Sequence, residues 1–115
     1  MSLKHLMRRI DAVNIANGWH EKEVTVPEHV ALLHSEVSEL FEAYRKGALT
    51  APCDKTEKMK VIGVEPLSNI EEEVADILIR ALDLCSRHGL DPDEICNSKL
   101  AYNASRGYRH GGKVV

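Results

Sequence analysis

Four acidic residues are spaced so that their carboxylates could act together. They form two pairs, Glu36-x-x-Glu39 and Glu73-x-x-Asp76, and residues three positions apart lie on one side of an α-helix. With Glu36 as the origin of a helical wheel, apolar residues occupy about 40° to 140° and Glu39 lies at about −60°. Glu73 and Asp76 have the same phase relative to their apolar neighbours. If the two apolar faces pack together, the four carboxylates meet at one border of the core.

Such a cluster needs a counter-charge, because two unit charges about 4 Å apart repel by roughly 4 kcal/mol at an effective dielectric of about 20. A hard divalent cation, Mg²⁺ or Mn²⁺ in its place, prefers oxygen ligands. The predicted metal ligands are therefore Glu36, Glu39, Glu73 and Asp76. Two alternatives stay open, namely solvated acids on a helix surface and ordinary ion pairs with Lys46 or Arg80. A ferritin-like di-iron site is disfavoured because the chain contains no Glu-x-x-His.

A second group of residues has the types and spacing to bind phosphate. Lys99, Asn103 and Arg106 share one face of a helix by their spacing. The glycine-rich segment that follows adds Arg109, His110 and Lys113. A metal that bridges phosphate oxygens, with Lys and Arg on the remaining charge, is the arrangement expected for polyphosphate chemistry. The alternative is that these bases only complement the dipole at a helix C-terminus.

Capping residues place both groups on four predicted helices, about 2–16, 26–46, 68–88 and 91–106. Thr25-Val26-Pro27-Glu28 and Ser68-Asn69-Ile70-Glu71 are capping boxes. The predicted fold class is all-α, a bundle of four main helices. The connection 48–67 is long for a compact domain, and Val61-Ile62-Gly63-Val64 is its only strand candidate.

The composition limits the functional class. The chain has 115 residues and a net charge of −3, and we expect one domain, 1–115, with a basic C-terminal tail, 107–115. The acidic balance argues against a nucleic-acid partner, and no apolar run approaches the roughly 18–20 residues of a membrane span. Three cysteines without a C-x-x-C pair favour a reducing, cytoplasmic compartment.

The small size of the chain favours self-association. Ile79 lies away from the apolar stripe of its predicted helix, and Leu82 widens that stripe. A second apolar surface of this kind is best buried against another copy of the chain. We therefore expect a homodimer, or a homotetramer built from dimers.

Two motifs resemble a known family. Ser35-Glu36-Val37-Ser38-Glu39-Leu40 and Glu72-Glu73-Val74-Ala75-Asp76-Ile77-Leu78 resemble the paired acid motifs of the MazG-like all-α nucleoside triphosphate pyrophosphohydrolases, a superfamily that includes dimeric dUTPases and dCTP pyrophosphatases. The segment 99–113 resembles the end of the MazG-like domain, and Trp19 resembles a tryptophan of the dCTP-pyrophosphatase branch. The resemblance covers about residues 17–113. Ser35 departs from it, since many relatives carry a further glutamate there.

The resemblance implies a helical, oligomeric, Mg²⁺-dependent enzyme that hydrolyses a nucleoside triphosphate to the monophosphate and pyrophosphate, as in the removal of surplus or non-canonical nucleotides. By position, the four paired acids match metal ligands, Lys99 and Arg106 match phosphate-contacting positions, and Asn103 matches a nucleotide-contacting one.

The sequence also suggests roles for single residues in the expected reaction. Glu39, at the outer edge of the stripe, is the favoured general base, with Glu36 as the other candidate. Trp19 either stacks on the nucleobase or plugs the end of the bundle. The competing function is a non-catalytic, antitoxin-like helical dimer that binds a partner protein.

Overall fold

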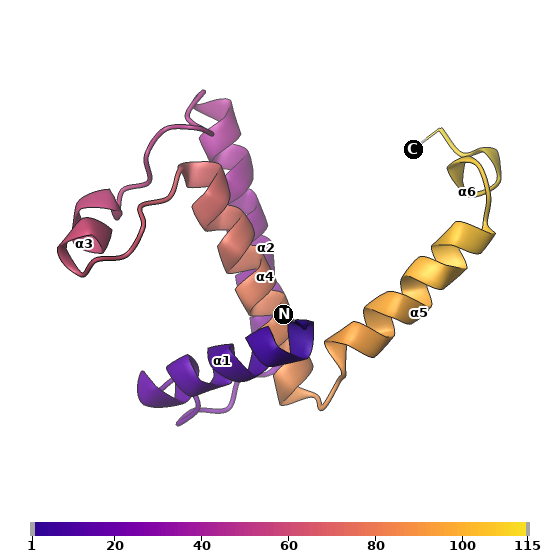
Figure 1. Ribbon diagram of the computed structural model, residues 1–115, viewed down its shortest axis with the longest axis horizontal. Coiled ribbons are helices and arrows are strands. Elements are labelled where there is room, and N and C mark those ends of the chain that lie inside the picture. The colour runs from indigo at the N-terminus through magenta and orange to yellow at the C-terminus, as the bar shows by residue number, and fades with distance from the viewer. Residues whose placement is uncertain (1, 115) are drawn as a thin grey trace. The chain divides into compact units, whose positions relative to one another are not determined.

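The computed structural model describes residues 2–114, apart from the side chain of His110, and its regular structure over that range is helical. The helices are α1 (Leu3–Ala16), α2 (Val26–Arg45), α3 (Thr56–Val61), α4 (Asn69–Arg87), α5 (Pro92–Ser105) and α6 (Arg109–Gly112) (Figure 1). The predicted all-α class is confirmed. None of the described helices is long and apolar enough to cross a membrane.

The chain divides into two compact units. Unit 1 comprises the residues up to Gly18 and those from Leu82 onward, and unit 2 comprises Trp19–Ala81. Unit 1 therefore holds α1, the last turns of α4, α5 and α6. Unit 2 holds α2, α3 and the first part of α4.

Capping residues start the four long helices where the sequence predicts. Ser68 and Glu71 form a complete capping box: the Glu71 amide donates to Ser68 Oγ at 3.3 Å, and the Ser68 amide donates to Glu71 Oε1 at 2.9 Å. Side-chain oxygens also cap the other three helices, at Ser2, Thr25 and Asp91. Because these caps satisfy amides that have no partner within the helix, the boundaries were readable from the sequence.

In unit 2, α2 and α4 run side by side in opposite directions (Figure 1). Arg80 of α4 joins the two helices twice. Its carbonyl oxygen lies 2.8 Å from His29 Nε2, and its Nε donates to Glu36 Oε1 at 3.4 Å. Both His29 and Glu36 are buried on α2. The pair of helices is thus held together partly by polar contacts.

The connection between α2 and α4 is more ordered than the sequence predicts. It contains α3, so Val61 ends a helix and does not begin a strand. The only β-type pairing among residues 2–114 is an isolated bridge between Pro52 and Ser68. Neither helical periodicity nor a capping motif predicts α3, because the helix has six residues and no side-chain hydrogen bond at its N-cap.

Backbone hydrogen bonds close the base of this connection. The Cys53 amide donates to the Leu67 carbonyl at 3.0 Å, and the Asn69 amide donates to the Ala51 carbonyl at 2.9 Å. The Cys53 side chain is 3% exposed. The segment is therefore anchored to the start of α4 and holds its residues in defined places.

Unit 1 is joined by charged and polar side chains. The Asp93 carboxylate of α5 accepts from the amides of Leu3 and Lys4, at 2.9 and 3.0 Å, and so caps α1. Near the end of α4, Asn14 Nδ2 of α1 donates to Asp83 Oδ1 at 3.4 Å. This turn of α4 is covered by α1, and Leu82 is only 5% exposed. Leu82, expected to belong to a surface that a second copy of the chain buries, is therefore buried within unit 1.

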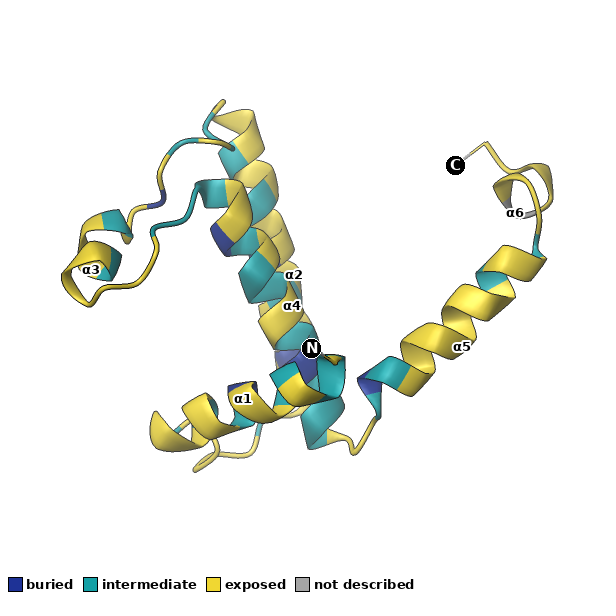
Figure 2. Ribbon diagram, in the orientation of Figure 1, coloured by how far each residue is buried: buried dark blue, intermediate teal, exposed yellow. Residues whose placement is uncertain are grey.

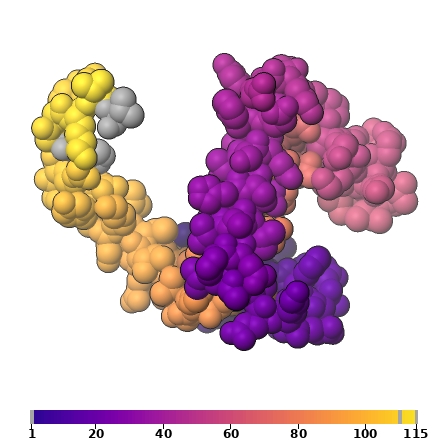
Figure 3. All heavy atoms as spheres, turned by 180° about the vertical axis from the view of Figure 1, so that it is seen from behind, coloured from indigo at the N-terminus to yellow at the C-terminus, as the bar shows by residue number. Residues whose placement is uncertain are grey.

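Apolar faces of α2 and α4 lie open in unit 2. Figure 2 colours most of the visible part of α2 as exposed, and Figure 3 shows atoms of α2 at the surface of unit 2. The exposed apolar side chains on these two helices include Val30, Val37, Phe41, Tyr44, Ile70, Val74, Leu78 and Ile79. Most of these residues belong to the stripes that the helical periodicity predicts as core-facing.

Candidate functional site

Three of the four predicted acids come together in unit 2. Glu36 of α2 and Glu73 and Asp76 of α4 each place a carboxylate oxygen within 4.8 Å of the others. They meet because α2 and α4 pack with these positions at their shared border. The convergence follows from the matched phase of the two Glu-x-x-acid pairs on their helices.

Burial and mutual repulsion disfavour the charged forms of these carboxyls. Burial raises the pKa of Glu36, and the charges of Asp76 and Glu39 raise it further, against the opposing effect of Arg80. Burial is also the main cause that raises the pKa of Asp76. For Glu73, burial and then the neighbouring Glu39 carboxylate raise the pKa to about 7. The three acids thus share more negative charge than their surroundings neutralise.

Glu73 also has an unsatisfied atom. Its Oε2 is buried and has no hydrogen-bond partner within the described part of the chain. A buried carboxylate oxygen without a partner costs on the order of 1–3 kcal/mol. It is therefore the atom of this cluster that most needs a ligand.

Glu39 occupies the rim of the cluster. It is exposed on α2, yet its charge raises the pKa values of Glu36, Glu73 and Asp76. The exposed position agrees with its predicted place at the outer edge of the apolar stripe. Water therefore reaches Glu39 more easily than it reaches the buried Glu36.

Two basic side chains lie beside the acids. Arg80, one of the two predicted neutralising residues, contacts Glu36. Sequence reasoning missed the other pair, in which Lys55 of the connection contacts the buried Glu72. The hydrogen bond to Glu72 is the main cause that raises the pKa of Lys55. Glu72 is the middle one of three consecutive acids, Glu71-Glu72-Glu73, but no sequence pattern links it to a lysine seventeen positions earlier.

This donor set fits a hard divalent cation. The ligands would be carboxylate oxygens, which Mg²⁺ and Mn²⁺ prefer. A cation among them would give Glu73 Oε2 a partner and would favour the ionised form of all three acids. Glu36, Glu73 and Asp76 are therefore the residues that could hold it, and Glu39 lies at the edge of the same group.

The predicted phosphate-binding residues belong to unit 1. Lys99 Nζ of α5 lies 5.0 Å from the centre of the Tyr102 ring. The Cζ atom of Arg106, the C-cap residue of α5, lies 5.6 Å from the same centre. The shared face predicted for Lys99 and Arg106 is thus present, with Tyr102 between them, and Asn103 is half-buried on the same helix. The sequence analysis did not single out Tyr102. Because the acids belong to unit 2, joint action of the two groups stays a prediction.

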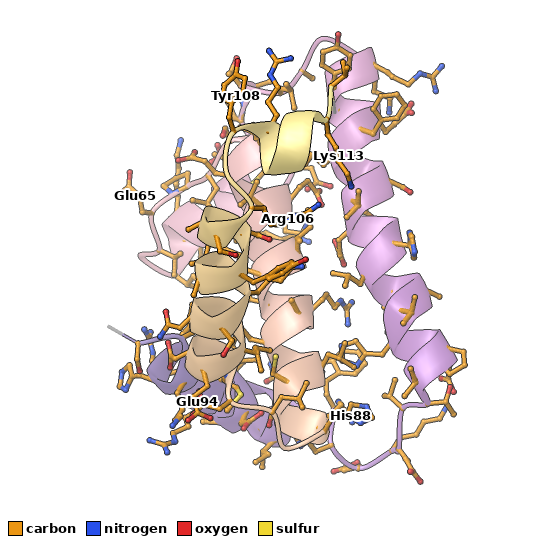
Figure 4. The ribbon with its side chains drawn as sticks, turned by 90° about the vertical axis from the view of Figure 1, so that its right-hand side faces the viewer. Glu65, His88, Glu94, Arg106, Tyr108 and Lys113 are labelled. Carbon is orange, nitrogen blue, oxygen red and sulfur yellow. The ribbon has the colours of Figure 1, made fainter. Side chains whose placement is uncertain are left out.

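The remaining predicted residues flank the long helices. Figure 4 shows Arg106 at the end of α5 and Tyr108 and Lys113 in the tail beyond it. The Arg109 guanidinium lies 5.4 Å from the centre of the Tyr108 ring. The side chain of His110 lies outside the described residues. Trp19 precedes α2 in unit 2 and is 64% exposed.

Comparisons with protein-family models, with curated proteins and with solved structures give no match to this chain. The class that fold and site define is that of an all-α protein with a carboxylate cluster between two antiparallel helices.

Proposed function

We propose that this protein binds Mg²⁺, or Mn²⁺ in its place, and hydrolyses a nucleoside triphosphate to the monophosphate and pyrophosphate. The observation that carries the proposal is the convergence of Glu36, Glu73 and Asp76, with Glu73 Oε2 buried and unpartnered. Such a group is costly unless a cation is bound to it. The choice of reaction is supported by the resemblance of the paired acid motifs to the MazG-like pyrophosphohydrolases.

The burial of each acid in unit 2 suggests its role in the reaction. The half-buried or buried acids Glu36, Glu73 and Asp76 would hold the cation, which neutralises and orients the phosphates when bound. Glu39 is exposed at the rim and accepts the proton of a water molecule that attacks the α-phosphorus. The bond from the α-phosphorus to the bridging oxygen then breaks, and pyrophosphate leaves. Glu36 is the less suitable base because it is buried and in contact with Arg80.

The remaining roles extend the proposal to the substrate. Lys99, Arg106, Arg109 and Lys113 would bind phosphate oxygens as donors of charge-assisted hydrogen bonds. Asn103 has the donor and acceptor atoms to read a nucleotide. Trp19, exposed before α2, has a ring surface on which a base can stack.

Self-association is part of the same proposal. Several large apolar side chains are exposed together on α2 and α4. Apolar residues on the surface of a monomer are more often scattered singly. A hollow on α4 is lined by Ile70, Glu71, Val74, Ala75 and Leu78. Burial of these faces against a second copy would give a homodimer or a tetramer of dimers.

A non-catalytic helical dimer that binds a partner protein is the second candidate, and the same open faces favour it. It gives no reason for three acids with raised pKa values at the border of the two helices. Melting curves with and without millimolar Mg²⁺ or Mn²⁺ separate the two candidates. A cation whose concentration is well above its dissociation constant stabilises the folded protein by about a kcal/mol or more.

The activity itself is tested with a panel of standard and modified nucleoside triphosphates in the presence of Mg²⁺. The proposal predicts pyrophosphate release from at least one of them. A protein that melts identically with and without the cation and releases no pyrophosphate would contradict it.

A further inference from the structure

Lys55 is held beside the acidic cluster by the fold of the connection between α2 and α4. It is the N-cap residue of α3 and lies two positions after the buried Cys53. Thr56 Oγ1 donates to the Cys53 carbonyl oxygen at 2.7 Å, and the Cys53 amide is bonded to Leu67. The position of Lys55 is thus fixed by its neighbours in the chain, although its side chain is 58% exposed.

The ammonium group of Lys55 has two carboxylate partners. It contacts Glu72, whose side chain is 12% exposed, and lies 3.2 Å from Asp54 Oδ1. Glu72 and Asp76 lie one helical turn apart on α4 and repel each other. The charge of Lys55 also acts on Asp76, in the opposite direction. Lys55 therefore partly neutralises the group of acids to which Glu36, Glu73 and Asp76 belong.

We propose that Lys55 is a positioned counter-ion that competes with the divalent cation for the negative charge of this cluster, and so sets the affinity of the site for the cation. The inference rests on the proposed function, because it assigns a role to Lys55 only if the acids bind a cation. Lys55 is a positioning residue here and not a catalytic one, since it acts through Glu72 and Asp76.

The proposal predicts opposite effects for the two members of the pair. Lys55→Met removes a positive charge beside the site and should tighten Mn²⁺ binding on the order of 10-fold. Glu72→Gln removes a negative charge and releases the ammonium group of Lys55, and it should weaken Mn²⁺ binding by a similar factor. The double variant restores the net charge and should bind Mn²⁺ within about threefold of the parent. If the pair served only to hold the connection in place, both single variants would change the affinity in the same direction.

The experiment is calorimetric titration of Mn²⁺ into the metal-free, full-length chain and its variants at low ionic strength. Lys58→Met is the matched control, because Lys58 is an exposed lysine on α3 in the same connection. Circular dichroism checks that each variant is folded. Lys55→Gln, which removes the same charge and keeps a hydrogen-bond donor for Glu72, takes the place of Lys55→Met if that variant does not fold.

Tightening in Lys55→Met, with weakening in Glu72→Gln and no change in Lys58→Met, is the expected result. A parent that binds Mn²⁺ while Lys55→Met and Lys58→Met bind it equally would overturn the counter-ion role alone. A parent that does not bind Mn²⁺ at millimolar concentration would overturn the proposed function and the counter-ion role together.

Discussion

Replacement of Glu73 by glutamine isolates the charge that makes the acidic cluster costly. Glu73→Gln keeps the shape of the side chain and removes its ionisation. In the folded protein the pKa of Glu73 is about 7, against an ordinary value of 4.5. Between pH 4.5 and about pH 7 the folded state therefore binds more protons than the unfolded state. The free energy of unfolding of the metal-free parent falls as the pH rises through this window.

The size of the effect follows from the same two values. At about 1.4 kcal/mol for each pH unit between them, ionised Glu73 would cost the parent roughly 3 kcal/mol. Partial solvent access reduces this to about 2 kcal/mol. Metal-free Glu73→Gln should therefore melt about 5–10 °C above the parent at pH 8. At pH 5 the difference should be small, because most of the folded parent is then protonated at Glu73.

The assay is thermal unfolding with a chelator present, at pH 5 and pH 8, and then with added Mg²⁺. Glu65→Gln is the control, because Glu65 is an exposed residue of the connection. The stabilisation by Mg²⁺ should shrink in Glu73→Gln only, and its pyrophosphate release should fall by orders of magnitude. A metal-free variant that melts below the parent at pH 8 and keeps its activity would refute the reasoning, since Glu73 would then serve in a structural ion pair.

Three further predictions follow from the site and its surroundings. Hydrolysis in ¹⁸O-labelled water should place the label on the monophosphate, because attack occurs at the α-phosphorus; mass spectrometry that finds it in orthophosphate would exclude this chemistry. Sedimentation at micromolar concentration should show a dimer or tetramer, and Val74→Asp on the open face of α4 should shift it toward the monomer; an unchanged mass in the variant would exclude that face. Mn²⁺ affinity should rise severalfold from pH 6 to pH 8, because Glu73 must lose its proton to bind a cation; calorimetry that shows no change would argue against Glu73 as a ligand.

Local signals made the long helices predictable. The cap at Thr25 and the capping box at Ser68 use side chains within three positions of each other, so the sequence alone shows both partners. The phase of Glu36 against Glu73 was predictable for a similar reason, since it depends only on the helical repeat. The sequence did not predict which face of each helix is covered, because that depends on the neighbouring helices, and the helical repeat does not identify them.

Leu82 and Lys55 illustrate that limit. Leu82 is buried in a turn of α4 that α1 covers. The spacing of apolar residues within α4 does not predict that α1 packs there. Lys55 meets Glu72 through a connection whose shape depends on the buried Cys53 and a few backbone hydrogen bonds. Contacts of this kind join segments without a shared repeat, and a single sequence does not reveal them.

The central claim is that Glu36, Glu73 and Asp76 together bind a divalent cation, and direct titration of Mn²⁺ tests it. The loss of the free-ion signal in electron paramagnetic resonance would be followed at pH 8 for the parent, Asp76→Asn and Glu65→Gln. The parent and Glu65→Gln should take up Mn²⁺ to saturation, and Asp76→Asn should bind it at least about tenfold more weakly because it loses a charged ligand. Equal uptake by Asp76→Asn and the parent, or no saturable uptake by the parent, would contradict the claim.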